Sequence, residues 1–216
     1  MLTLHYFPGN ASMTPHMLLE ELGVPYALEL VDRKNNAHKS PAYLKLNPNG
    51  LIPVLLDGEL VLYETAAICL HLSDTQPQAA LMPPMDTRDR AHAYKWLMWL
   101  TNTLQATLIV YFYPERWADT GHTEVAAEVQ RNAQARVGPL LDQLDAEIER
   151  RGGPWFMGAQ FTLLDAYVFT LCRWTRNFPS APARDRKHLG PYLQRMLARP
   201  SVQRVLANEG LSEPYV

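Results

Sequence analysis

Cysteine is scarce in this chain of 216 residues, which contains only Cys69 and Cys172. No Cys-x-x-Cys pair occurs, so a protein that reduces disulfides through its own dithiol is excluded. The two cysteines are far apart in sequence and lie within apolar patterns of helical type. We therefore expect both to be small core side chains and not parts of a disulfide framework.

Long apolar runs and a strong excess of one charge are also absent. No stretch approaches the roughly eighteen uncharged apolar residues that a membrane span needs. No basic segment followed by an apolar run opens the chain, so no secretory signal is recognised and the cytoplasm is the expected location. The formal net charge is −2, and the longest basic cluster, residues 184–188, contains Asp185. We expect neither a membrane nor a nucleic acid as a partner.

The first 78 residues alternate strand and helix patterns. Gly23 ends the first helical pattern, and Asp57-Gly58 is a hairpin turn between two apolar strands. A parallel pair of strands joined by a right-handed crossover and followed by an antiparallel hairpin is typical of a thioredoxin-like α/β domain. The predicted elements are strand 2–7, a helix from about residue 12 to 22, strand 26–31, helix 39–46, strands 54–56 and 60–62, and a helix from residue 64 to 71.

A stiff connector separates this part from a helical remainder. Residues 76–86 contain three prolines, and we place a thioredoxin-like domain at 1–78, a linker at 79–87 and an all-helical bundle at 88–216. The predicted helices are 88–113, which Pro114 breaks, 124–151, 162–178, and two shorter ones before and after Pro200.

Ile52-Pro53, followed by Glu64-Thr65, is the most informative motif. A proline at a strand entrance can leave the N–H and C=O of the preceding residue unpaired, ready for another extended backbone. A helix start binds an anion through its free N–H groups and dipole. Glu64 can hold an ammonium group while Thr65 and the helix hold a carboxylate, so the motif predicts a site for a small zwitterionic peptide.

Together these motifs resemble the bacterial cytosolic glutathione S-transferases over nearly the whole chain. The motifs are Tyr6 to Ser12, Ile52-Pro53 (the cis-proline of the family), the run 64–68 and the run 161–166. The resemblance implies a thioredoxin-like domain that binds glutathione as co-substrate, a helical domain that supplies much of an electrophile pocket, a homodimer, no metal, and a role in detoxification. The resemblance also implies that catalysis is activation of the glutathione thiol for attack on a hydrophobic electrophile, either in conjugation or in a related use of glutathione such as thiolytic dehalogenation or peroxide reduction.

Three residues are candidates for activating the thiol, since a donor aimed at sulfur stabilises the thiolate. Tyr6 resembles the catalytic tyrosine of some members, Asn10 falls at the catalytic serine of others, and Ser12 follows the position where beta-class members carry a reactive cysteine. That position is Ala11 here, so a mixed disulfide with glutathione is not expected. We rank Ser12 first, helped by Asn10, with Tyr6 contributing less. Ser12 is also a good N-cap for the first helix.

Further roles follow from the resemblance. His38 and Lys39 precede the second helix and are expected to meet the glycine carboxylate of glutathione, although a solvated loop is an equal alternative. Thr-x-x-Asp at 162–165 is a capping-box pattern, to which we assign no chemistry. Asn102 and Gln105 share one helix face, as pocket groups or as dimer contacts. The residues expected around the electrophile are Phe7, Asn102, Gln105, Tyr113 and Trp117.

A rival interpretation is a non-catalytic protein of this fold that uses the cleft, or only the dimer surface, for binding. Ile52-Pro53 together with Glu64-Thr65 favours a working peptide site and therefore the enzyme.

Overall fold

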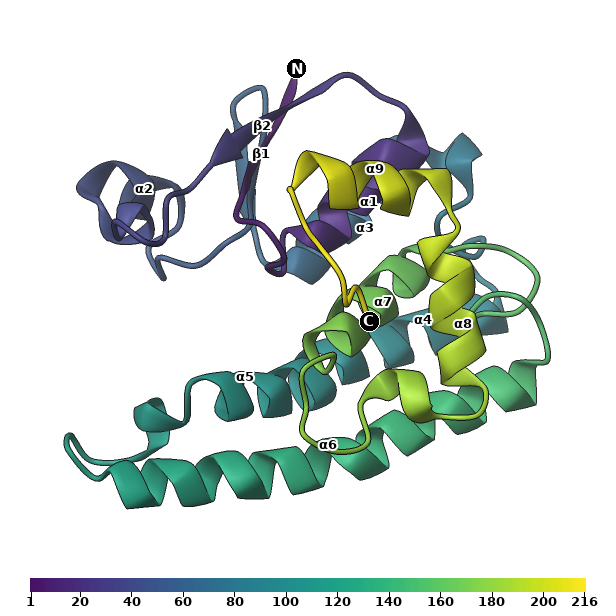
Figure 1. Cartoon of the computed structure of the whole chain (residues 1–216). Helices are drawn as coiled ribbons and strands as arrows, with labels where there is room; N and C mark the ends of the chain where they lie inside the picture. The colour runs from purple at the N-terminus through teal and green to yellow at the C-terminus, as the bar shows by residue number, and fades with distance from the viewer. The chain divides into compact units, whose positions relative to one another are not determined.

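The computed structural model describes residues 1–216, which pack as two compact units. One unit comprises residues 1–82 with 196–215, and the other comprises residues 83–195 with Val216. Figure 1 labels the helices and strands of both units.

The first unit is built on a four-stranded sheet of order β2-β1-β3-β4. Strands β1 (Leu2–Tyr6) and β2 (Tyr26–Leu30) are parallel, whereas β3 (Val54–Asp57) runs antiparallel to β1 and to β4 (Leu60–Tyr63). Gly58, with φ of +60°, allows the tight turn between β3 and β4. The thioredoxin-like arrangement predicted from the sequence is confirmed.

Helices cover both faces of this sheet. Helix α2 lies on one side, and α1, α3 and α9 lie together on the other (Figure 1). Arg199, the N-cap residue of α9, pairs with Glu21 on α1, its Nη2 lying 2.5 Å from Oε2. The helices of this unit are α1 (Met13–Leu22), η1 (Ala37–Lys39), α2 (Pro41–Leu46), α3 (Thr65–Thr75), η2 (Pro77–Ala79) and α9 (Pro200–Asn208).

Helix α9 therefore packs with the unit that begins the chain, although a boundary drawn along the sequence groups it with the helical remainder. The limits 1–78 and 88–216 stay a prediction. A linear boundary cannot represent a helix that returns to the first unit.

The second unit is helical. The predicted helix 88–113 is helical throughout but contains a π-helical segment, η3 (Leu100–Gln105), between α4 (Arg88–Trp99) and α5 (Ala106–Phe112). The predicted helix 162–178 ends earlier, because Thr175 donates its hydroxyl to Cys172 O and accepts the N–H of Ala183. The other helices are η4 (Pro114–Trp117), α6 (Thr123–Arg151), α7 (Leu163–Trp174), η5 (Ala183–Asp185) and α8 (Leu189–Leu197), whose last two residues belong to the first unit.

Asp165 organises the core of the helical unit. Its carboxylate, fully buried, accepts hydrogen bonds from the N–H groups of Phe156 and Thr162, both at 2.7 Å, and from the Tyr192 hydroxyl at 2.9 Å. The capping box predicted at the start of α7 is present, and its Asp165 also bonds α7 to Phe156 and to Tyr192 on α8.

Both cysteines are buried and unpaired, as expected. Burial raises the pKa of each thiol well above its ordinary value, so neither is a reactive thiolate. None of the helices is long and apolar enough to cross a membrane.

Candidate functional site

The sheet register brings the motif residues of the first unit together at one end of the strands β1, β3 and β4. Val54 pairs with His5 on one side and with Tyr63 on the other. Pro53 precedes Val54, Tyr6 follows His5 as the last residue of β1, and Glu64 follows Tyr63 directly after β4. Motif residues that are far apart in sequence thus lie close to the end of β1, where the loop to α1 begins.

The turn before Pro53 leaves backbone groups open. The Ile52-Pro53 bond is cis, as the family resemblance implied. The carbonyl of Leu51 accepts hydrogen bonds from the Tyr43 hydroxyl at 2.8 Å and the Asn47 side-chain amide at 2.9 Å. Ile52 itself makes no backbone hydrogen bond within the chain. An extended ligand can therefore pair with its N–H and C=O, in the manner of an added strand.

Glu64 and Thr65 form the start of α3 beside this turn. Glu64 is exposed and has φ of +71° and ψ of +113°, an unfavourable backbone conformation for a residue other than glycine. No side chain caps the helix, so its first N–H groups remain available to an anion, and Thr65, its first residue, is buried. Local strain at an exposed carboxylate beside free donors is typical of a binding position.

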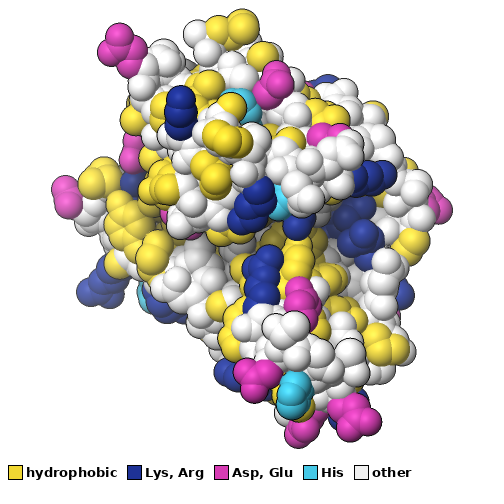
Figure 2. Space-filling view, turned by 90° about the vertical axis from the view of Figure 1, so that its left-hand side faces the viewer, with side chains coloured by type: hydrophobic (Ala, Val, Ile, Leu, Met, Phe, Trp, Pro, Cys, Tyr) yellow, Lys and Arg dark blue, Asp and Glu magenta, His cyan; other side chains and the backbone are white.

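His38 and Lys39 lie against the turn that leads to Ile52. The Lys39 ammonium donates to Asn49 O at 3.3 Å. A Cβ on Gly50, whose φ is +59°, would come within 2.7 Å of the Lys39 Nζ and 2.8 Å of the His38 carbonyl. Glycine is therefore required at position 50, because of the positive φ and because a Cβ would collide with these neighbours. Burial lowers the pKa of His38, as do the nearby charges of Arg33 and Lys39. Figure 2, which views the side of the molecule that carries α2, shows lysine and arginine side chains among hydrophobic ones.

The loop between β1 and α1 holds Asn10, Ala11 and Ser12. The Ser12 hydroxyl is completely buried and lies 3.2 Å from both the N–H and the C=O of Phe7. Ser12 is the N-cap residue of α1, but its side chain makes no capping bond, because Phe7 occupies it. Asn10 accepts the N–H of Ala11 at 2.6 Å through Oδ1, which leaves its amide N–H groups free to donate.

Tyr6 is directed toward α1. Its ring meets the His16 ring edge-on, with centroids 6.2 Å apart. Burial raises the pKa of the Tyr6 phenol, and the charge of Glu209 raises it further, so the phenol stays protonated near neutral pH.

The residues expected around the electrophile fall into both units. Phe7 packs on the cluster of Val31, Tyr43, Ile52 and Val54 in the first unit. In the helical unit, the Gln105 carbonyl accepts from Tyr167 at 2.6 Å, while Asn102 is exposed. Both belong to η3, and π-helical segments are frequent at functional sites. Tyr113 stacks with the guanidinium of Arg116 at 4.0 Å, and Trp117 is half exposed.

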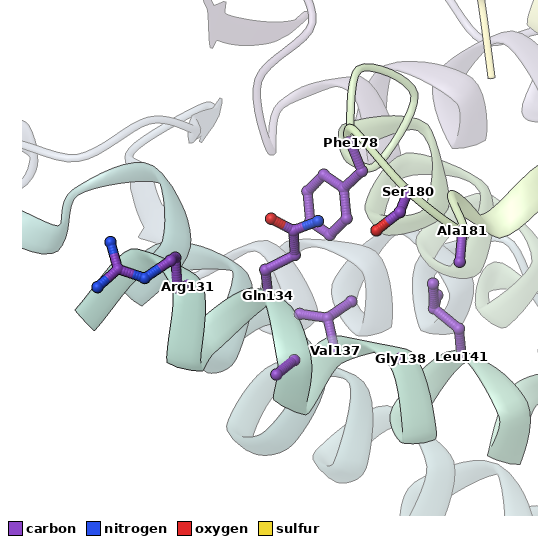
Figure 3. A pocket seen from close by; sticks show the side chains of 9 residues that line it. Arg131, Gln134, Val137, Gly138, Leu141, Phe178, Ser180 and Ala181 are labelled. Carbon is purple, nitrogen blue, oxygen red and sulfur yellow. The ribbon is translucent and has the colours of Figure 1, made fainter. Parts of the chain in front are cut away.

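A separate cavity of about 350 Å³ opens in the helical unit between α6 and the segment after α7 (Figure 3). Apolar side chains and a few polar ones line it, and no residue expected at the electrophile is among them. The lining residues are Arg131, Gln134, Ala135, Val137, Gly138, Leu141, Phe178, Ser180 and Ala181.

Sequence reasoning missed a buried polar group beneath the loop. Glu209, after α9, accepts the Gly9 N–H at 2.7 Å and lies 2.8 Å from His16 Nδ1. Neither side chain is exposed. No motif includes Glu209, and its distance from the loop in sequence leaves no local signal.

The chain matches two family models in order. Residues 10–75 match the glutathione S-transferase N-terminal domain, and residues 99–200 match the C-terminal domain. Among curated relatives, glutathione S-transferase GstA of Escherichia coli O157:H7 is 31% identical over 210 residues, covering 96% of this chain and 98% of that protein.

Solved structures agree in fold over nearly the full length. A glutathione transferase homologue from Sulfitobacter, crystallised with bound glutathione, is 28% identical with a TM-score of 0.88 and covers 98% of this chain and 99% of that one. A glutathione transferase from Methylococcus capsulatus is 31% identical with a TM-score of 0.82, covering 97% and 99%. The motifs, the fold and these similarities agree: the chain belongs to the glutathione S-transferase family.

Proposed function

We propose that this protein is an active glutathione transferase that binds glutathione along the edge formed by Ile52 and Glu64. The observation that carries the proposal is the unpaired backbone of Ile52, two residues before Val54, whose partner Tyr63 in β4 is followed by Glu64 and the open start of α3. The relative from Sulfitobacter holds glutathione in its crystal structure, which supports the same ligand here.

Each end of glutathione has a matching group. The γ-glutamyl ammonium pairs with the Glu64 carboxylate, and the neighbouring carboxylate meets Thr65 and the first N–H groups of α3. The cysteinyl backbone pairs with Ile52 as one rung of an added strand. Lys39 supplies the positive charge for the glycine carboxylate, and His38 lies beside it.

The loop between β1 and α1 activates the thiol. A free thiol has a pKa near 8.5, and a donor aimed at sulfur favours the thiolate. Ser12 and Asn10 stay the proposed pair. The Ser12 hydroxyl stabilises the loop through Phe7, and the free amide of Asn10 supplies the donor toward sulfur. The thiolate then attacks the electrophilic carbon, a bond to sulfur forms, and the leaving group departs with its electron pair.

The absorbance of bound thiolate against pH tests these roles in Ser12→Ala, Asn10→Ala and Tyr6→Phe. We expect the first two to raise the pKa of the bound thiol by about one unit, equivalent to about 1.4 kcal/mol, and Tyr6→Phe to raise it less. A shift in Tyr6→Phe alone contradicts this ranking and makes the phenol the donor.

The electrophile is a small hydrophobic molecule held by residues of the helical unit. The polar groups of η3, Asn102 and Gln105, orient it, while Tyr113 and Trp117 supply aromatic surface. Conversion of glutathione and a chloronitroarene to the thioether, with release of chloride, tests the activity. Saturable glutathione binding without any turnover over a panel of electrophiles would favour the non-catalytic alternative.

The protein acts as a homodimer in the cytoplasm. Exposed apolar side chains in each unit support this assembly, among them Val61 on β4, 41% exposed, and Met98 on α4, 46% exposed. Light scattering should give twice the chain mass for the wild type and a monomer for Val61→Glu or Met98→Glu. Val125→Glu, on an equally exposed valine of α6, is the control and should leave the dimer intact.

A further inference from the structure

We propose that Glu209, which follows α9 near the end of the chain, is a positioning residue for the thiol-activating loop. The inference rests on the proposed function only in assigning that role to the loop. It concerns a buried group that lies outside every motif recognised in the sequence.

The contacts of Glu209 are directed at the loop. Oε2 accepts the Gly9 N–H at 2.7 Å, and Oε1 lies 2.8 Å from Nδ1 of His16, in the first turn of α1. Gly9 has φ of +68°, a conformation that glycine adopts readily and other residues do not. The carboxylate therefore holds the loop at the point where the chain turns between Phe7 and Asn10.

The side chain of Glu209 is fully buried, as is that of His16. A buried carboxylate is costly unless it is hydrogen-bonded and paired. Here the loop N–H is one of its partners, so movement of Gly9 away from Glu209 leaves a buried acceptor unsatisfied. That penalty is what keeps the loop in a single geometry.

The contact continues into the helix pair beneath the loop. His16 Nε2 lies 3.1 Å from the Tyr26 hydroxyl, which donates to Glu20, and Glu20 pairs with Arg204 on α9. Glu209 thus contacts the loop and α1 directly, while Arg204 of α9 pairs with α1 through Glu20.

The Glu209 carboxylate also affects Tyr6, one of the candidate thiol-activating residues. The charge of Glu209 contributes to the raised pKa of Tyr6 at the end of β1. The Glu209 carboxylate is therefore close enough to affect groups beside Pro53, where the sulfur is expected.

The test compares Glu209→Ala with Glu21→Ala. Glu21 also links α1 to α9, through Arg199 and Ser201, but does not touch the loop. We expect Glu209→Ala to lower kcat about tenfold to a hundredfold, the range for a small displacement of catalytic groups, with the KM for glutathione changed less than about threefold. Glu21→Ala should lose stability but keep kcat within about twofold. Equal kcat losses in the two variants overturn the proposal.

Glu209→Gln separates position from charge. The amide can still accept the Gly9 N–H and donate to His16, so we expect kcat to remain within about threefold of wild type. A loss as large as that of Glu209→Ala overturns a positioning role.

Amide hydrogen exchange gives a reading that needs no activity. In the wild type, Gly9 should exchange at least about a hundredfold more slowly than an unprotected amide, and Glu209→Ala should remove that protection. A fast-exchanging Gly9 in the wild type overturns the proposal even if Glu209→Ala does not fold. Slow Gly9 exchange in a wild type that lacks transferase activity refutes the proposed function instead and leaves the contact intact.

Discussion

Two substitutions at Glu64 can separate the effect of its carboxylate on glutathione binding from the effect of its backbone strain on stability. Its carboxylate is proposed to hold the γ-glutamyl ammonium, and its backbone lies at φ of +71°. Glu64→Ala removes the carboxylate and keeps the backbone strain, whereas Glu64→Gly removes both. The two variants should therefore lose affinity alike and differ in stability.

The magnitudes follow from these contacts. A hydrogen bond to a charged group is worth about 1.5–3 kcal/mol, so both variants should bind glutathione about tenfold to 150-fold more weakly. Strain of this kind costs about 1–3 kcal/mol, and the extra chain entropy of glycine returns about 0.5–1 kcal/mol of it. Glu64→Gly should therefore unfold with a free energy roughly 1 kcal/mol higher than that of Glu64→Ala.

Calorimetry with glutathione and urea denaturation measure the two quantities. Glu59 is the matched control, because it is exposed, lies in the adjacent hairpin and has no positive φ. Glu59→Ala and Glu59→Gly should bind glutathione normally, and there glycine should be the less stable variant. Unchanged affinity in Glu64→Ala refutes the ammonium assignment, and a Glu64→Gly variant less stable than Glu64→Ala refutes the strain argument.

Three other predictions concern stability and reactivity. Asp165→Ala leaves the N–H groups of Phe156 and Thr162 and the Tyr192 hydroxyl without an acceptor, at about 1–3 kcal/mol each. The free energy of unfolding should therefore fall by more than about 3 kcal/mol in chemical denaturation, and a loss below about 1 kcal/mol contradicts this. Burial would raise the pKa of Glu147, but hydrogen bonds from two arginines outweigh it and lower the pKa from 4.5 to about 2. Its contribution to stability is thus complete above pH 4.5 and is lost as the pH falls toward 2, by at most about 3 kcal/mol; Glu147→Gln should reduce that loss of stability in acid titrations, and an unchanged profile contradicts the assignment. Oxidised glutathione should leave no adduct by mass spectrometry on native protein, because Ala11 offers no thiol and Cys69 and Cys172 are buried; an adduct on the folded chain contradicts the core assignment.

Local chemistry accounts for the parts of the fold that were predictable from sequence. Gly23 ends α1 in a left-handed conformation, Gly58 turns the hairpin, and Asp165 closes the first turn of α7. Each acts on residues within a few positions of itself, so the pattern of neighbouring residues is sufficient to recognise it. The paired motifs at residues 52–53 and 64–65 indicated the family for the same reason.

The details of the site depended on residues brought together from distant parts of the chain. The sequence of the loop allowed Ser12 to cap α1, but the fold brings Phe7 within reach and occupies the hydroxyl. Helix α9 follows the helical unit in sequence yet packs on α1, and only that return brings Glu209 to Gly9. A hydrogen bond between residues 200 positions apart has no local signature, because it exists only once the sheet, α1 and α9 have packed.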